Sequence, residues 1–327
     1  MRPEELMALL GCPATDPLVE QALAHFRIRR RPQLEWDEDD VDGPVVETRD
    51  WLINRRLGIE FGFEDEAAFL GREAGEYGLG PMLLTQLYFY CDHEGVNPYR
   101  GTLPFGLQCG DSRDSARVRL STWEATRRSY VRDTWELEGA TAIISYVDDG
   151  RRIGFVLCTL PRPPKPPADD GPAQLPATDE MLAVLGAPWR DARLQTLFAP
   201  LHMERYLEEQ GETRIVNLRE TCGLELRFEP EGGRSEQLVF TGVRFYRDRE
   251  LDARGWPGAL PLDLEFNDSP EVMLQRISRP PDHRFDEMFE GHATWHLTES
   301  AVHVTYSTMF NWIVNVHVMA RGALAGT

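Results

Sequence analysis

The sequence predicts an α+β protein made of two tandem, diverged repeats, each an antiparallel sheet covered on one face by helices. Two observations support this prediction. Five sequence blocks occur twice in the same order, and segments that alternate between apolar and polar residues recur in both halves. A chain of 327 residues also has the length of two domains of about 150 residues each.

The duplication is visible in five pairs of segments. In the most similar pair, YRGTLPFGLQCGDS aligns with WPGALPLDLEFNDS. In another pair, Trp135 and Tyr146 align with Trp295 and Tyr306, and we interpret all four as core residues of the repeat. The paired segments are 9–13 with 184–188, 57–64 with 222–229, 84–92 with 240–248, 99–112 with 256–269, and 133–146 with 293–306. Five blocks in one order are hard to obtain by chance, so we infer an internal duplication.

One segment separates the two copies. Residues 160–172 read LPRPPKPPADDGP, and such a proline run favours an extended, semi-rigid spacer over helix or strand. We therefore predict a first α+β repeat at 1–159, a proline-rich linker at 160–175 and a second α+β repeat at 176–327.

The elements of each repeat follow in the same order. A pair of helices is expected first, and then two strands whose apolar residues recur at every second position, as in Leu57 to Glu64 and Leu224 to Phe228. Asp111-Ser112 and Asp268-Ser269 are expected to cap short helices that end near Leu120 and Ile277. A three-stranded meander closes each repeat. The expected helical pairs are 4–10 with 16–26 and 178–185 with 190–207, and the expected later strands are 82–90, 133–138, 141–147, 152–159, 237–246, 293–298, 301–307 and 312–319. An alternative is that each copy contains two smaller helix-plus-sheet modules.

The composition excludes several functions. The formal net charge is −19, and the acidity is shared, with 18 basic and 28 acidic residues up to Leu160 and 17 and 26 after it. Such a surface repels phosphate, which argues against nucleic-acid binding, and it attracts basic partners. No apolar run is long enough for a membrane span, and the N-terminus does not resemble a signal peptide. Five scattered cysteines suggest reduced thiols, so we expect a cytoplasmic protein.

No recognised catalytic or cofactor motif occurs in the chain, so we predict no enzyme activity, no catalytic residues and no cofactor or metal. Two groups have metal-ligand chemistry, but the expected strands leave their side chains divergent or solvent-facing. Neighbouring carboxylates are too common in an acidic chain to mark a catalytic pair. The metal candidates are Cys91-Asp92-His93 and the histidines 292, 296, 303 and 317, and the carboxylate groups are Glu64-Asp65-Glu66 and Glu208-Glu209.

One segment is a candidate partner-binding site. Six carboxylates occur within eight residues, together with one tryptophan: Glu35, Trp36, Asp37, Glu38, Asp39, Asp40 and Asp42. The simpler interpretation is a solvated acidic loop. In the functional interpretation, the carboxylates imitate a phosphate backbone and enter the basic cleft of a nuclease, while Trp36 provides an apolar anchor. The second repeat has no counterpart.

The segment LPFGL-x-x-G-D-S, the following D-x-W strand and the I-S-Y-x-D-D-G turn carry a family resemblance. They resemble the modules of SmpA/OmlA-type assembly lipoproteins and of the β-lactamase inhibitory protein, and more closely the duplicated immunity proteins of bacterial type VI secretion effectors. The resemblance implies an immunity protein that binds and neutralises a cognate toxin with a basic surface, acting in the cytosol, most plausibly a nuclease. The alternatives are a non-catalytic scaffold or assembly factor, or a hydrolase with an unrecognised site. Whether the chain also forms a homodimer stays open.

Overall fold

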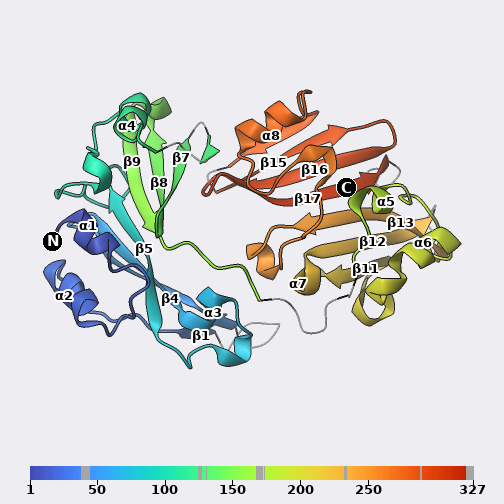
Figure 1. Ribbon diagram of the computed structural model, residues 1–327, viewed down its shortest axis with the longest axis horizontal. Coiled ribbons are helices and arrows are strands. Elements are labelled where there is room, and N and C mark those ends of the chain that lie inside the picture. The colour runs from blue at the N-terminus through green and yellow to red at the C-terminus, as the bar shows by residue number, and fades with distance from the viewer. Residues whose placement is uncertain are drawn as a thin grey trace. The chain divides into compact units, whose positions relative to one another are not determined.

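The computed structural model describes residues 1–37, 45–123, 127–129, 131–166, 172, 174–231, 234–287 and 289–321. The chain forms two compact units, Met1–Pro163 and Pro164–Thr327. Each unit contains one large antiparallel sheet and several short helices (Figure 1), which confirms the predicted α+β class with two tandem repeats. Among the described residues, no helix combines the length and apolar character needed to cross a membrane.

The elements follow the predicted order, and all helices are short. The α-helices are α1 (Pro3–Met7), α2 (Pro17–His25), α3 (Glu66–Leu70), α4 (Arg113–Arg119), α5 (Thr178–Leu182), α6 (Ala192–Phe198), α7 (Arg219–Cys222) and α8 (Pro270–Arg276). The strands of the first unit are β1 (Glu35–Asp37), β2 (Val45–Glu47), β3 (Arg49–Asn54), β4 (Ile59–Asp65), β5 (Met82–Tyr90), β6 (Arg127–Arg128), β7 (Arg132–Leu137), β8 (Ala140–Val147) and β9 (Arg152–Thr159). Those of the second are β10 (Leu207–Gln210), β11 (Thr213–Leu218), β12 (Leu224–Glu231), β13 (Arg234–Tyr246), β14 (His283–Asp286), β15 (Glu290–His296), β16 (Ser300–Ser307) and β17 (Trp312–Ala320).

The two large sheets share one topology. The first has the strand order β3-β4-β5-β9-β8-β7-β6, and the second has β11-β12-β13-β17-β16-β15-β14 with β10 added at its outer edge. The β-bulges also coincide, since the register shifts after Gly62 and Ser145 in the first sheet and after Arg227 and Thr305 in the second. The duplication therefore extends to the hydrogen-bond register of the strands.

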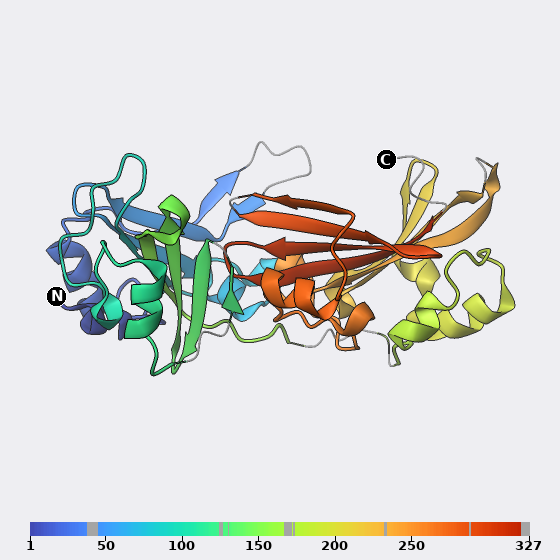
Figure 2. The same ribbon diagram turned by 90° about the horizontal axis from the view of Figure 1, so that it is seen from above.

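Helices cover one face of each sheet, as Figure 2 shows for the second unit, where the helices lie together on one side of the strands. The core of the first unit joins residues of α1, α2 and α4 with Phe61, Phe89 and Trp135 of the sheet. The core of the second joins residues of α5, α6 and α8 with Trp295 and other strand residues. Trp135 and Trp295 are both buried, as predicted for core residues. The opposite face of each sheet carries no helix from these cores, and we call it the helix-free face.

The strongest local constraint shared by the two copies is a glycine. Gly58 and Gly223 both have positive φ, at 69° and 70°. A Cβ at either position would lie within 2.3 Å of a backbone carbonyl oxygen, that of Asn97 or of Arg254. Both the positive φ and the nearby carbonyl oxygen therefore exclude a side chain. This explains why both copies have glycine immediately before β4 and β12.

A second shared feature fixes the loop before α4 and α8. Asp111 accepts a hydrogen bond from the backbone N–H of Gln108 at 2.8 Å and pairs with Arg119 at 2.9 Å. In the second unit, Asp268 repeats both contacts, at 2.8 Å from the N–H of Glu265 and 3.0 Å from Arg276. The hydroxyls of the serines that follow both aspartates cap their helices, as predicted.

The structure corrects three expectations. The helix predicted at 190–207 ends at Phe198, because Pro200 has no N–H to donate to the carbonyl oxygen of Thr196, and short 3₁₀ turns interrupted at His202 (φ 49°) follow. The sequence also did not predict the outer strands β3, β6, β10, β11 and β14. Finally, each unit contains one continuous sheet, so the alternative of two smaller modules per copy is wrong.

Helix α4 of the first unit and helix α8 of the second are attached to their sheets by different chemistry. In the first unit, Arg117 of α4 donates two hydrogen bonds to the fully buried Asp133 of β7, at 2.8 and 2.7 Å. The Tyr146 hydroxyl donates to the same carboxylate at 3.1 Å. The aligned residues of the second unit are Leu274 and Ala293, which belong to the apolar core. A buried ion pair thus occupies the place of an apolar contact.

The substitution Asp133→Ala is expected to lower the free energy of unfolding by about 3 kcal/mol, because it removes the buried carboxylate on which Arg117 and Tyr146 converge. The double variant Arg117→Leu/Asp133→Ala, which installs the residues of the second repeat, should lose less because the guanidinium is removed as well. Urea denaturation of both variants measures the difference. A double variant less stable than the single one would contradict this account.

Candidate functional site

The predicted acidic site lies on a small ribbon of the first unit. Strands β1 and β2 form their own two-stranded antiparallel sheet, in which Glu35 lies directly opposite Glu47. Both of these glutamates are exposed. Like charges directly opposite one another destabilise a strand pair. We call the paired strands β1 and β2 the acidic ribbon; residues 38–44, which join them in the sequence, lie outside the described residues.

The other predicted site residues are less fully placed. Trp36 and Asp37 belong to β1, and their backbones lie opposite Val46 and Val45. Glu38, Asp39, Asp40 and Asp42 lie outside the described residues. The structure therefore shows that the predicted segment begins in a strand, β1, which pairs with β2 at Val45–Glu47 and which the interpretation as a simple loop did not include.

Asp50 ties the segment that leads into the acidic ribbon to β3. This buried carboxylate accepts hydrogen bonds from Arg30 Nη2 at 2.5 Å and from the backbone N–H of Gln33 at 3.1 Å. Arg30 also donates to the carbonyl oxygen of Trp51 at 3.0 Å. The chain is therefore fixed on both sides of the ribbon, through Gln33 before it and through β3 after it.

The other carboxylate groups singled out in the sequence have structural roles. Glu64 is buried between Arg49, at 3.3 Å, and Arg162. Asp65 caps α3 by accepting from the N–H of Ala68 at 3.1 Å. Glu208 accepts from Asn217 at 2.9 Å, and Glu209 pairs with Arg214 at 3.1 Å. These contacts satisfy the carboxylates within the fold and do not arrange them as a facing acid–base pair.

The side chains of Cys91-Asp92-His93 do not converge. Cys91 forms a disulfide, Asp92 pairs with Arg152 at 2.8 Å, and the His93 ring stacks on Tyr90 with centroids 4.9 Å apart. Among the described residues, no three His, Cys, Asp or Glu side chains lie together in a way that would hold a metal ion.

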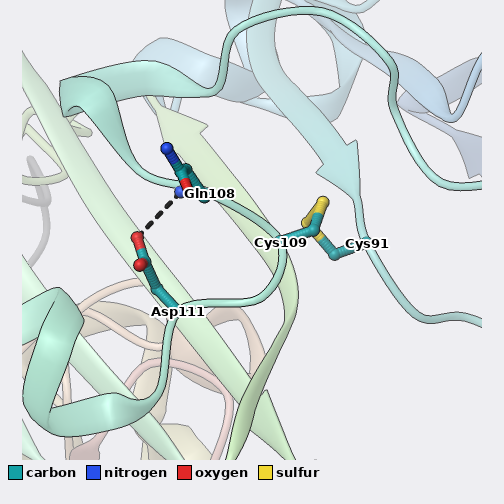
Figure 3. Close-up of a disulfide and its surroundings, with 4 residues drawn as sticks. All are labelled: Cys91, Gln108, Cys109 and Asp111. Carbon is teal, nitrogen blue, oxygen red and sulfur yellow. Dashed lines mark hydrogen bonds between the residues drawn. A yellow bond between two sulfur atoms is a disulfide. The ribbon is translucent and has the colours of Figure 1, made fainter.

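The expectation that all five cysteines are reduced is wrong. Cys91 and Cys109 form a disulfide that joins the residue after β5 to the loop before α4 (Figure 3). Figure 3 also shows the bond from Gln108 to Asp111, which holds the same loop from its other side. Cys12, Cys158 and Cys222 are free thiols. No sequence pattern indicates this pair, because the two cysteines lie in separate elements and have no cysteine counterparts in the second repeat.

The second unit makes the same connection without sulfur. Arg247 and Phe266 align with Cys91 and Cys109. Arg247 donates from Nη1 to the carbonyl oxygen of Phe266 at 2.7 Å and from Nη2 to the side chain of Asn267 at 3.0 Å. Both repeats therefore connect the end of a strand to the loop before a helix. The first repeat connects β5 to the loop before α4 by a covalent bond, and the second connects β13 to the loop before α8 by hydrogen bonds. This equivalence indicates a structural role for the disulfide.

Reduction of the disulfide is expected to lower the stability of the first unit by about 3 kcal/mol, from the entropy of closing a loop between residues 18 positions apart. The variant Cys91→Ala/Cys109→Ala should show the lower stability with or without reductant. Denaturation curves with and without dithiothreitol measure this effect. If dithiothreitol destabilised the double variant as much as it destabilises the unchanged protein, a group other than this disulfide would be responsible.

Histidines gather on the helix-free face of the second sheet. His292 and His303 lie with ring centroids 5.2 Å apart, and His303 Nδ1 is 2.9 Å from the Thr294 hydroxyl. His317 lies directly opposite His303, with its Nδ1 3.3 Å from Arg244 Nη2. His292 and His296 share one face of β15, and His296 packs against His283, with centroids 5.7 Å apart. Cross-strand register, which the sequence does not reveal, decides these pairs.

Burial and positive neighbours hold two of these histidines neutral. Burial, followed by the charges of His292 and Arg244, lowers the pKa of His303 from 6.5 to about 4. Burial, followed by Arg244, His303 and Arg227, lowers the pKa of His317 to about 3. The expectation of a fully solvent-facing strand side is therefore wrong for His317, which is buried against Gly242.

These shifts predict a loss of stability in acid. A folded-state pKa below the unfolded value means that the unfolded chain binds more protons, so stability falls as pH decreases from about 6.5 towards 4. Each histidine contributes a slope of at most about 1.4 kcal/mol per pH unit. Urea denaturation at several pH values should show a shallower slope for His303→Gln/His317→Gln than for the unchanged protein. An unchanged slope would assign the acid sensitivity to other groups.

A site for an enzyme would combine a pocket with titratable groups of shifted pKa. A groove of about 550 Å³ lies beside α6 in the second unit and is lined by Trp189, Gln195, Phe198, Ala199, His202, Met203, Glu204 and Arg205. His303 and His317 lie on the sheet and not among these lining residues.

Comparisons with known proteins show no family for this chain. No family model and no curated protein matches it. It is similar to an extracellular protein containing a SCP domain from Bacillus anthracis str. Ames, with 10% identity and a TM-score of 0.31 over 50% of this chain and 51% of that one. It is also similar to a DUF4309 family protein (YjgB) from Bacillus subtilis subsp. subtilis str. 168, with 14% identity and a TM-score of 0.25 over 38% of this chain and 76% of that one. The alignment thus spans about half of the first protein, and neither likeness carries an argument about fold or function.

Proposed function

We propose that this chain is an immunity-type inhibitor that binds and neutralises a toxin domain with a basic surface. The observation that supports the proposal best is the acidic ribbon, in which Glu35 and Glu47 lie opposite each other within a segment that carries six clustered carboxylates. Repulsion between like charges disfavours this arrangement in the isolated protein. A cationic partner would relieve the repulsion, so the ribbon is better suited to a complex than to an isolated chain.

The proposed toxin activity is nucleic-acid cleavage. Enzymes that act on nucleic acids bind the phosphate backbone through clustered lysines and arginines. A row of carboxylates occupies such a cleft by charge complementarity, and this mode of inhibition needs no chemistry by the inhibitor. The net charge of −19 adds long-range attraction that accelerates association.

The second candidate function is a scaffold or assembly factor. A hydrolase has no support from the groove beside α6, whose lining residues do not include His303 or His317. A cytoplasmic site of action is part of the proposal, but the Cys91–Cys109 disulfide weighs against it, because structural disulfides persist mainly in oxidising compartments.

The proposal predicts salt-dependent binding to the protein encoded by the reading frame adjacent to the gene of this chain. Calorimetric titration at about 50 and about 500 mM salt should show weaker binding at high salt, because screening shortens the range of the attraction. The variant Glu35→Lys/Glu47→Lys should weaken binding by at least roughly tenfold at the lower salt concentration, as expected for close charge pairs across an interface.

The matched control is Glu212→Lys/Glu299→Lys, which changes the net charge equally at two exposed positions of the second unit. Its binding should change much less. If both variants weaken binding equally, net charge alone explains the effect. Binding with the same affinity at both salt concentrations would contradict the electrostatic mechanism.

A further inference from the structure

Strand β14 is the last strand of the second sheet, so one of its edges pairs with β15 and the other faces away from the sheet. Its first three residues, His283, Arg284 and Phe285, are exposed. Phe285 is 52% exposed and lies on the helix-free face against His292, with ring centroids 5.5 Å apart. An outer strand with an exposed aromatic residue is a template on which a further strand can pair.

The pairing of β14 with β15 fixes the direction of its backbone groups. The N–H of Glu287 donates to the carbonyl oxygen of Glu290 at 2.8 Å, so the backbone of Glu287 points towards β15. Successive residues of an antiparallel strand alternate in this direction. Phe285 therefore also points its N–H and C=O towards β15, whereas Arg284 and Asp286 point theirs away from the sheet. These outward groups are the donors and acceptors that an added strand would use.

The charges along this edge are complementary to those of a second copy. When two identical antiparallel edges meet on a two-fold axis, the residue on the axis faces its own copy and its two neighbours face each other. With the axis on Phe285, the two phenylalanine rings face each other, and Arg284 of each copy lies opposite Asp286 of the other. His283 then lies opposite Glu287. Moving the axis by one residue places Arg284 or Asp286 opposite its own copy, which like-charge repulsion disfavours.

The side chains of Arg284 and Asp286 are held in place within the second unit. Arg284 Nε lies 2.9 Å from Asp286 Oδ2, and the Tyr306 hydroxyl donates to Asp286 Oδ1 at 2.5 Å. The two side chains are 33% and 22% exposed. Asp282, the charged residue just before β14, pairs with Arg279 at 2.7 Å. The edge therefore presents partly exposed charges of both signs in fixed positions, so little side-chain entropy is lost when a strand is added.

The other outer strands of the two large sheets, β3, β6 and β10, are less suited to pairing with a second copy. Strand β6 consists of two arginines, so an arginine would face its own copy. Strand β10 has two adjacent glutamates at its centre, and an axis on either one places it opposite its copy. In β3, the carbonyl oxygen of Trp51 already accepts a hydrogen bond from the half-exposed Arg30 at 3.0 Å. Among these four strands, β14 is therefore the best suited to self-pairing.

We propose that β14 is a self-association edge, on which a second copy of this chain adds its own β14 in the antiparallel direction with the two-fold axis through Phe285. Backbone hydrogen bonds between Arg284 of one copy and Asp286 of the other join the two second sheets, and the two phenylalanine rings pack against each other. The contact is small, so the dimer is weak. This inference goes beyond the proposed function and does not depend on it, because neither Glu35 nor Glu47 belongs to this edge.

The first test is disulfide cross-linking of the full chain under mild oxidation. In the proposed register, the Cα atoms of residue 285 in the two copies lie about 4.5 Å apart, as a non-hydrogen-bonded pair does. This distance suits a disulfide, so Phe285→Cys is expected to form a cross-linked dimer. The matched control His283→Cys lies on the same strand and face, but its two copies are four residues apart, about 14 Å, and should not cross-link. The unchanged chain, treated in the same way, measures the contribution of the native free thiols.

The second test is sedimentation equilibrium of the full chain, which measures Kd of the dimer. Salt at about 150 mM limits the repulsion between two copies that each carry a net charge of −19. Phe285→Lys should raise Kd by at least roughly tenfold, because two ammonium groups then face each other. His283→Lys adds the same charge on the same face but lies opposite Glu287, so it should leave Kd unchanged or lower it.

The inference is overturned if the unchanged chain stays monomeric up to about 100 µM, the range of a weak complex, and Phe285→Cys forms no more dimer than the unchanged chain. Equal cross-linking of Phe285→Cys and His283→Cys, or equal loss of the dimer in both lysine variants, would place the contact elsewhere and would also overturn it. Circular dichroism checks that each variant folds. If Phe285→Lys does not fold, the cross-linking result alone decides.

Discussion

Coverage of one face of each sheet by helices is the constraint on which this structure depends. Period-two alternation places Phe61, Phe89 and Trp135 on the face that the helices cover, and the second unit does the same with its aligned residues. Because helices cover only one face, the register of every strand is fixed by that face. The coincident bulges after Ser145 and Thr305 show how closely the register was retained after duplication. Residues of the helix-free face and of the sheet edges are not subject to this constraint, so their identity could change.

The two copies diverged both within the helix-covered core and on the helix-free faces. They solved equivalent structural problems with different chemistry: Cys91–Cys109 corresponds to the hydrogen bonds of Arg247, and the buried Arg117–Asp133 pair corresponds to an apolar contact. On the helix-free faces, Tyr88 and Leu157 of the first sheet correspond to Arg244 and His317 of the second. One copy carries aromatic and aliphatic residues there and the other carries basic ones, so the duplication has produced two different surfaces on one scaffold.

The sequence was sufficient for the fold class and for most strands, because the aligned blocks and the alternation of Leu57 to Glu64 record the buried face directly. It failed at the sheet edges. Strand β3 reads RDWLIN, in which Asp50 and Trp51 break the expected pattern because the first is buried by Arg30 and Gln33 and the second remains exposed. The disulfide and the histidine pairs depend on cross-strand register and loop closure, which single-sequence patterns do not encode. The acidic segment was recognised from composition, but its pairing into a ribbon was not.

The central claim is that this molecule inhibits by presenting a shaped acidic surface. Co-expression in bacteria of the protein encoded by the adjacent reading frame, with and without this chain, tests it most directly, with colony survival as the readout. The account predicts that the neighbouring protein kills cells alone, that the unchanged chain restores survival, and that a chain lacking the ribbon carboxylates does not. Survival that is equally restored by the chain without those carboxylates would contradict the account, as would a failure of the unchanged chain to protect.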